Sequence, residues 1–167
     1  MKEIVIYDAN IFIDVIDMAI IDVLRDADYR IHTTSLVMNE IVRAEQKIAL
    51  SGLQITVFRY DNINQYADLY AFKDSIQPQK NLSDSDFSVL KLALDKSVPL
   101  YTSDAQLRRV AKIYGVQVHG SLGLVIELNK ARLLSRAEAE DALARLRKAN
   151  SRMSESVFAE ALEALID

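Results

Sequence analysis

At 167 residues, the chain fits one domain that is large enough to bury a hydrophobic core, and half of its residues are hydrophobic. It contains no cysteine, which excludes disulfides, thiol nucleophiles and cysteine-ligated zinc and suits a reducing cytoplasm. With only two histidines, any bound metal would be held by oxygen, which favours Mg²⁺ or Mn²⁺. A net charge of −4 gives no general attraction for nucleic acid.

Short apolar runs alternate with helical periodicity from the first residues to about residue 120. The opening run is too short for a signal peptide and ends in an acid, so it is expected to be a strand. No segment reaches the roughly 20 apolar residues that a membrane helix needs. Strands are expected at residues 4–7, 30–33, 54–58, 98–101 and 116–118, and helices at 10–25, 36–50, 62–72, 85–96 and 105–114. This alternation predicts a parallel α/β sheet, and the proline-containing segment 73–82 is expected to be a flexible loop.

The pattern changes after residue 122, where the strands stop. Ser135 and Glu138 form a capping box that opens a helix running toward Lys148, and residues 155–166 have amphipathic spacing. This tail completes the core, forms a dimer surface or meets a partner, and core completion is the default. Because no linker is visible, we expect one domain over residues 1–167, with a core at about 1–130 and C-terminal helices at about 135–167.

Two acids follow directly on predicted strands. Asp8 comes after the first strand, and Asp104 comes after the segment that ends at Ser103. In open α/β sheets, ligands bind beyond the carboxyl ends of the strands, so these two side chains share one crevice if their strands are neighbours. The alternative for each is structural, because Asp is a favoured helix N-cap and both positions precede a helix.

Two further acids lie on predicted helices that start at the same edge. A rotation of 100° per residue places Asp86 within an apolar arc, although it could instead close a capping box with Ser83. Glu40 lies at the edge of an apolar stripe, one turn into its helix, and could instead reach solvent or pair with Lys47. The arc around Asp86 is formed by Val89, Leu90, Ala93 and Leu94, and the stripe beside Glu40 by Val37, Ile41, Ala44 and Ile48.

The four acids together predict more than each does alone. Unpaired carboxylates that converge in a partly buried site repel each other at a cost of several kcal/mol. A divalent cation removes that cost, and oxygen ligation suits Mg²⁺ or Mn²⁺, which also contact phosphate. The reaction class that follows is hydrolysis of a phosphate ester.

Four short motifs, in this order and spacing, resemble those of PIN domains, and the resemblance covers essentially the whole chain. They are the first strand with its acid at Ile4–Asn10, the segment with a glutamate at Ser35–Val42, the acid that leads an apolar helix at Asp86–Ala93, and the strand with its acid at Leu100–Asp104. The tail around Arg152–Ser154 resembles the C-terminal extension of one prokaryotic PIN subgroup. One departure is Ser88, near which many relatives carry a further acid.

The resemblance implies a three-layer α/β/α fold with a five-stranded parallel sheet and a C-terminal helical extension. It implies Mg²⁺- or Mn²⁺-dependent cleavage of RNA by an endoribonuclease, and dimerisation. It also suggests the toxin of a VapBC-like toxin–antitoxin pair, neutralised by an antitoxin protein in the cytoplasm.

Roles for individual residues follow from the motifs. Asp8 and Asp104 are expected to be direct metal ligands, Asp86 a ligand or the holder of a metal water, and Glu40 an orienter of water or a general base. Smaller polar groups are expected to bond metal waters or phosphate, or only local backbone, namely Asn10, Thr102 and Ser103. Arg108 and Arg109 could hold substrate phosphate, whereas Asp14 and Asp17 are expected to be surface acids.

Three rival hypotheses remain open. A receiver domain of two-component signalling needs an acid directly after its third strand, and Asp61 comes three residues past Phe58. A phosphatase of the haloacid dehalogenase type needs a second acid two residues after Asp8, where this chain has Asn10. The third hypothesis is a PIN-like fold that binds RNA or a partner without catalysis.

Overall fold

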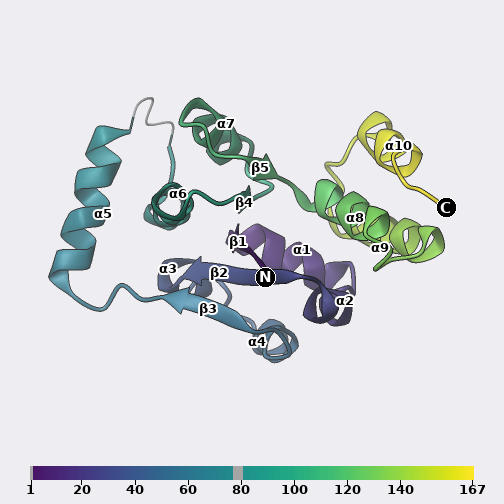
Figure 1. Cartoon of the computed structure of the whole chain (residues 1–167), viewed down its shortest axis with the longest axis horizontal. Coiled ribbons are helices and arrows are strands. Elements are labelled where there is room, and N and C mark those ends of the chain that lie inside the picture. Colours follow the sequence, from purple (N-terminus) through teal and green to yellow (C-terminus); the bar gives the residue numbers. More distant parts are fainter. Residues whose placement is uncertain (1, 77–80) are drawn as a thin grey trace.

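The computed structural model describes residues 2–76 and 81–167. One parallel sheet with the order β3-β2-β1-β4-β5 forms its centre (Figure 1). Its strands are β1 (Glu3–Tyr7), β2 (Tyr29–Thr34), β3 (Ile55–Phe58), β4 (Leu100–Tyr101) and β5 (Val118–His119). The predicted five-stranded parallel sheet is therefore confirmed.

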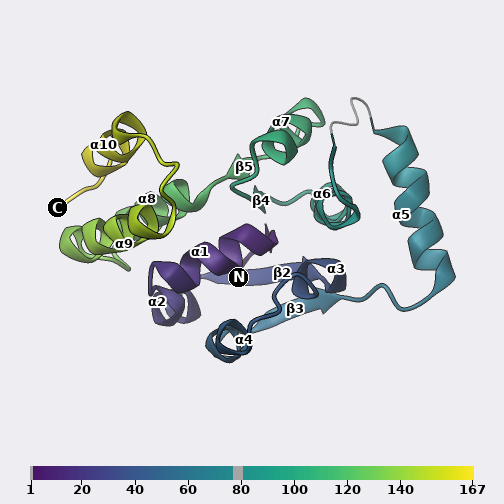
Figure 2. The ribbon, with the colours of Figure 1, turned by 180° about the vertical axis from the view of Figure 1, so that it is seen from behind.

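Ten helices lie within the described residues and surround the sheet. They are α1 (Ala9–Asp17), α2 (Ile21–Asp26), α3 (Ser35–Met38), α4 (Ala44–Leu50), α5 (Ile63–Ser75), α6 (Asp84–Lys96), α7 (Ala105–Ile113), α8 (Ser121–Lys130), α9 (Arg136–Ala149) and α10 (Glu155–Glu163). Figures 1 and 2 show α5, α6 and α7 at one side of the molecule and α1, α8 and α9 at the other. Within the described residues, no helix combines the length and the apolar character needed to cross a membrane.

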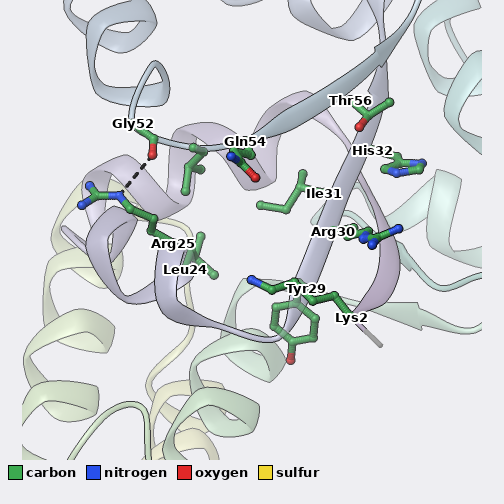
Figure 3. A pocket seen from close by; sticks show the side chains of 11 residues that line it. Lys2, Leu24, Arg25, Tyr29, Arg30, Ile31, His32, Gly52, Gln54 and Thr56 are labelled. Carbon is green, nitrogen blue, oxygen red and sulfur yellow. Dashed lines mark hydrogen bonds between the residues drawn. The ribbon is translucent and has the colours of Figure 1, made fainter.

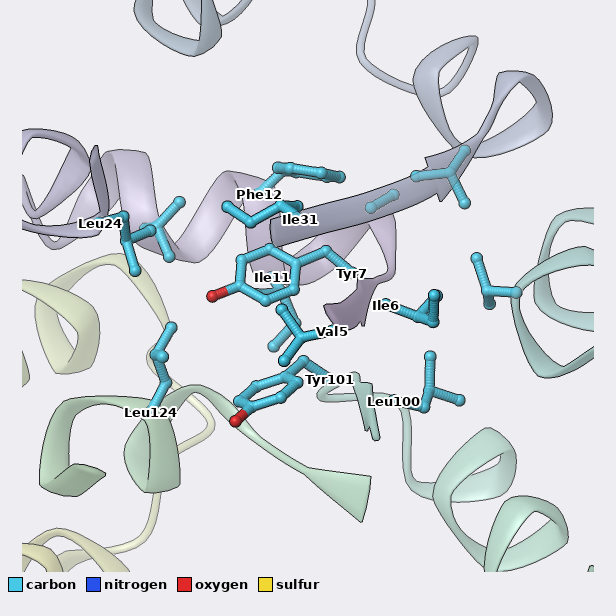
Figure 4. Close-up of a cluster of buried hydrophobic side chains, with 14 of the residues drawn as sticks. Val5, Ile6, Tyr7, Ile11, Phe12, Leu24, Ile31, Leu100, Tyr101 and Leu124 are labelled. Carbon is cyan, nitrogen blue, oxygen red and sulfur yellow. The ribbon is translucent and has the colours of Figure 1, made fainter. Parts of the chain in front are cut away.

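The core forms because successive side chains of β1 point to opposite faces of the sheet. Tyr7 packs against Phe12 and Tyr101, with ring centroids 5.4 and 5.3 Å apart. Figure 4 shows Tyr7 and Tyr101 on the side of α1 and α8, whereas Ile6 lies on the other side of the strand. All of these side chains are buried, so the end of β1 is fixed from both faces.

Both long helices expected near the amino terminus are interrupted. The helix expected at 10–25 is divided into α1 and α2, and Ala19 between them has a left-handed φ of 58°. The helix expected at 36–50 ends after one turn at Met38 and resumes at Ala44. Ile48 is consequently 72% exposed and does not belong to the buried stripe that periodicity predicted, although Ile41 does.

The remaining differences are smaller. α5 continues to Ser75, so the loop expected at 73–82 begins later, and its residues 77–80 lie outside the described part of the chain. The strand expected at 98–101 is only two residues long. α8 was not predicted at all, although Leu124 and Leu128 are spaced as on a helix and both are buried.

The C-terminal tail packs against the rest of the chain. Ala161 and Leu165 are buried, and α10 lies against α8 and α9 (Figure 1). The side-chain amide of Asn129 accepts from the backbone N–H of Ile166 at 2.7 Å and donates to its carbonyl at 3.2 Å. These contacts agree with the expected core-completing role of the tail.

Candidate active site at the carboxyl edge of the sheet

Asp8 is held at the end of β1, beside the end of β4. Its backbone N–H donates to the carbonyl of Tyr101 at 3.1 Å, which continues the pairing of the two central strands. Its side chain is 3% exposed. One carboxylate oxygen, Oδ1, accepts from the N–H of Ala9 at 2.8 Å, so the capping interaction proposed as the alternative role is present. The other oxygen, Oδ2, accepts from Thr102 at 2.8 Å and from Asn10 at 3.2 Å.

Thr102 links Asp8 to Asp104 through two hydrogen bonds. Its fully buried hydroxyl donates to Asp8 and accepts from the backbone N–H of Asp104 at 3.1 Å. The Asp104 carboxylate caps α7 by accepting from the N–H of Leu107 at 2.7 Å. Strand order thus confirms that Asp8 and Asp104 lie at neighbouring strand ends, at the point where the sheet changes winding direction.

Asp86 lies in the first turn of α6 and is partly buried. It closes the capping box that was the alternative reading, accepting from the N–H of Ser83 at 2.8 Å while its own N–H donates to the Ser83 hydroxyl at 3.1 Å. Ser88, two residues further along, is fully buried and bonds the hydroxyl of Thr34 at 2.7 Å. The capping bond orients the Asp86 carboxylate, and the negative charge of this group still acts on the acids at the strand ends.

Glu40 is exposed, as in the alternative in which it reaches solvent, but the element in which it lies differs from the expectation. It lies in the turn after α3 and not inside a continuous helix, and its side chain is exposed. The expected alternative of a pair with Lys47 is not formed. Instead, Oε2 of Glu40 accepts from the hydroxyl of Ser85 at 3.1 Å, which brings Glu40 beside the start of α6.

The acids influence one another electrostatically. Burial chiefly, and the negative charges of Asp86 and Glu40 to a smaller extent, raise the pKa of Asp8 to about 6 against the lowering effect of the Thr102 and Ala9 bonds. Burial also raises the pKa of Asp86, and the charge of Asp104 contributes to that rise. All four predicted acids therefore belong to one group of mutually repelling carboxylates.

This acidic group is open. Among residues 2–76 and 81–167, no three acidic or histidine side chains enclose a single point closely enough to hold a metal ion. Mg²⁺, however, commonly uses only one or two protein carboxylates together with water and substrate phosphate. Two carboxylates of the group Asp8, Asp86 and Asp104, together with water, would supply an all-oxygen donor set of that kind.

A second polar group extends from the acids toward α8. The amide of Asn10, whose nitrogen donates to Asp8, accepts through its oxygen from the N–H of Ser103 at 2.9 Å. The hydroxyls of Ser103 and Ser121 both donate to Oδ2 of Asp14. Asp14 is therefore not the surface acid that was expected, because burial raises its pKa and two hydroxyls hold it.

Positive charge lies on α7 next to Asp104. Arg108 is partly buried, Arg109 is exposed, and together with Lys112 they border a hollow of about 300 Å³ that also includes Ser103. A larger cavity of about 730 Å³ opens elsewhere, between α2 and the start of β2 and β3 (Figure 3). It is lined by basic, neutral polar and apolar side chains without a carboxylate, and it lies toward the amino ends of the strands, away from the acids.

Strand order and the acids at the carboxyl edge define an α/β protein with a carboxylate-based site. A model of the PIN-domain family DUF3368 matches residues 4–166. The chain belongs to the PIN-domain family, as its motifs predicted. No curated protein matches it at a significant level.

Solved structures that are similar to the chain include the following two. One is a PilT N-terminus domain protein from the archaeon Sulfolobus solfataricus P2, with 14% identity, 79% of this chain and 94% of that chain covered, and a TM-score of 0.46. The other is VapBC2 from Rickettsia felis, bound to a DNA fragment from its promoter, with 13% identity, 70% and 98% covered, and a TM-score of 0.48.

Proposed function

We propose that this PIN domain is a Mg²⁺- or Mn²⁺-dependent endoribonuclease that hydrolyses phosphodiester bonds of RNA. The observation that carries the proposal is the gathering of Asp8, Asp86 and Asp104 at the carboxyl edge of the sheet, where burial and mutual repulsion raise the pKa of the first two. Carboxylates in such a position are costly to keep ionised without a cation. Family membership supports a nuclease as the reaction class.

Each acid receives a role from its surroundings. Asp8 and Asp104 are proposed as metal ligands, and Asp86 as a third ligand or as the holder of a water beside them. The bound cation would polarise the phosphoryl oxygen and lower the pKa of an attacking water. Ser85 holds the exposed side chain of Glu40 beside the other acids. From there Glu40 would orient that water or accept its proton.

The neighbouring polar groups complete the site. Thr102 and Asn10 fix the Asp8 carboxylate, while Ser103 fixes Asn10. Arg108 would bind a substrate phosphate, because its guanidinium forms no ion pair within the described part of the chain. Local positive charge on α7 would thus offset the net negative charge of the protein.

Biological context adds further predictions. A homodimer, an antitoxin partner and a cytoplasmic location stay predictions of the family resemblance and of the cysteine-free composition. If the enzyme is a toxin, its induced expression in a bacterial host should arrest growth, and Asp8→Asn should relieve the arrest. Growth that is unaffected by an active enzyme would remove the toxin role and leave the ribonuclease activity standing.

The reaction is tested with purified protein and a mixed pool of structured and single-stranded RNAs. We expect internal cuts with Mn²⁺ or Mg²⁺, none in EDTA, and none in DNA of matched sequence. If folded protein cuts nothing and shows no heat of Mn²⁺ binding by calorimetry, the non-catalytic binding module becomes the correct account.

A further inference from the structure

A cavity of about 520 Å³ adjoins the acidic site on the side of the C-terminal helices. Its size is within the usual range for small-molecule sites. It opens between the amino end of α8 and the segment that connects α9 to α10, two elements that lie together in Figure 1. Side chains that line it include Asp14, Ser103, Arg108, Leu122, Met153 and Val157.

Polar contacts connect this cavity with the acids. Ser103 precedes Asp104 and lines the cavity, and its N–H donates to the Asn10 amide that is bonded to Asp8. Its hydroxyl donates to Asp14 at 3.1 Å, inside the cavity. Because Ser103 is adjacent in sequence to Asp104, a nucleotide whose phosphate lies at the acids would have the cavity beside it.

Two arginines contribute positive charge to the lining of this cavity. Arg108 lines both this cavity and the hollow beside Arg109, so it lies between the two. Its Nη1 atom approaches Gly120 so closely that a β-carbon there would be 3.1 Å from it. Arg152 also lines the cavity, and neither Arg108 nor Arg152 forms an ion pair with a described residue. Both are available to a backbone phosphate.

The cavity wall offers apolar contact and a carboxylate acceptor, Asp14. Leu122 and Met153 are partly buried, and Val157 is 43% exposed, so they provide a surface against which a flat ring can lie. Oδ2 of Asp14 accepts both serine hydroxyls, whereas Oδ1 accepts no bond from a described side chain. A carboxylate oxygen favours an amino group and is repelled by a carbonyl oxygen.

We propose that this cavity binds an RNA base that carries an exocyclic amino group, next to the cleaved phosphate. Asp14 would accept from that amino group, which cytosine, adenine and guanine carry, whereas uracil has none and presents a carbonyl oxygen at the position of the cytosine amino group. The C-terminal helices would then contribute to substrate choice as well as to the core. The inference rests on the proposed ribonuclease function and specifies the base that this site prefers.

Binding without catalysis separates the two proposals. Short fluorescent oligonucleotides of cytidine, adenosine or uridine are titrated with wild-type protein in EDTA, and anisotropy gives the affinities. We expect cytidine and adenosine to bind roughly tenfold more tightly than uridine. Equal affinity for all three would overturn the base subsite.

Variants locate the preference in the cavity. Val157→Trp fills it and should weaken cytidine binding roughly tenfold, whereas Ala159→Trp, on the opposite face of α10, should not. Asp14→Asn should abolish the preference over uridine, and the matched charge change Asp17→Asn should retain it. Binding by Val157→Trp equal to that of the wild type would overturn the inference.

Cleavage provides the independent control. Base-selective binding without cleavage in Mn²⁺ would retain the subsite and remove the proposed function. Cleavage by a protein that binds all three oligonucleotides with equal affinity would retain the proposed function and remove the base subsite.

Discussion

The hydroxyl of Thr102 donates to Oδ2 of Asp8 at 2.8 Å and accepts from the backbone N–H of Asp104 at 3.1 Å. One buried side chain at the end of β4 thus fixes the relative positions of two acids that are 96 residues apart in the sequence. The donated bond also favours the ionised form of Asp8, against burial and the nearby negative charges. Thr102 is therefore a positioning residue for both carboxylates.

Replacing Thr102 by valine keeps its shape and removes the hydroxyl. Loss of a bond to a charged group costs on the order of 1.5–3 kcal/mol, so we expect RNA cleavage to slow by roughly ten- to a hundredfold. The pH at which cleavage reaches half its maximum should also rise, because Asp8 loses a bond that favours its ionised form. Thr102→Ser should restore both properties. Wild-type rate and pH profile in Thr102→Val would contradict this role.

Asp8 is expected to reduce stability in the absence of metal. Its folded-state pKa is raised from 3.8 to about 6, so its contribution to stability is fully present below pH 3.8 and is lost as pH rises through 6. Asp8→Asn should therefore be more stable than the wild type near neutral pH in EDTA, by on the order of 2–3 kcal/mol. Thermal denaturation measures the difference, which should shrink toward pH 4. A variant that is less stable than the wild type near neutral pH would contradict the pKa assignment.

Two acids near the start of α6 provide a matched pair for metal binding. Asp86 faces the other acids, whereas Asp84 accepts from Lys73 and Tyr70, each at 3.3 Å. Asp86→Asn should weaken Mn²⁺ binding at least roughly tenfold in calorimetry, because it removes a negatively charged oxygen that is proposed to bind the metal or its water. Asp84→Asn should bind Mn²⁺ almost as the wild type does. Equal losses in both variants would show a nonspecific charge effect instead.

The C-terminal tail is expected to be required for stability. A chain that ends after Lys148 loses the buried Ala161 and Leu165, together with the cation–π contact of Arg147 with Phe158 at 4.6 Å. The loss should amount to on the order of 3 kcal/mol and lower the melting temperature clearly. An unchanged melting temperature with an altered oligomeric state would show that the tail serves a partner instead.

The local sequence was sufficient to predict the position of an acid where that position depends on a single strand or helix. The apolar run before Asp8 and the one before Asp104 predicted their strands, and the carboxyl ends of parallel strands lie at one edge of the sheet. Helical rotation alone predicted that Asp86 is shielded from solvent, and the capping box with Ser83 that was its alternative role is present. These signals depend on a few adjacent residues, so no knowledge of distant packing was needed.

The features that the sequence did not predict depend on tertiary packing. Ala19 adopts a left-handed conformation although alanine is the strongest helix former, so its sequence carries no sign of the break between α1 and α2. Glu40 follows a helix that stops after one turn without a proline or glycine. Asp14 was missed because its partner Ser121 lies 107 residues away, at the start of a helix that was itself not predicted.

The most direct measurement is the rate of Mn²⁺-dependent cleavage of one labelled single-stranded RNA by wild type, Asp8→Asn and Asp17→Asn. Asp8 is buried among the acids, whereas Asp17 ends α1 on the exposed surface, so both variants lose one charge and only one changes the site. We expect wild type and Asp17→Asn to cut at similar rates and Asp8→Asn to be roughly a thousandfold slower or inactive. Cleavage by Asp8→Asn at the wild-type rate would contradict the assignment of the carboxyl edge as the catalytic site.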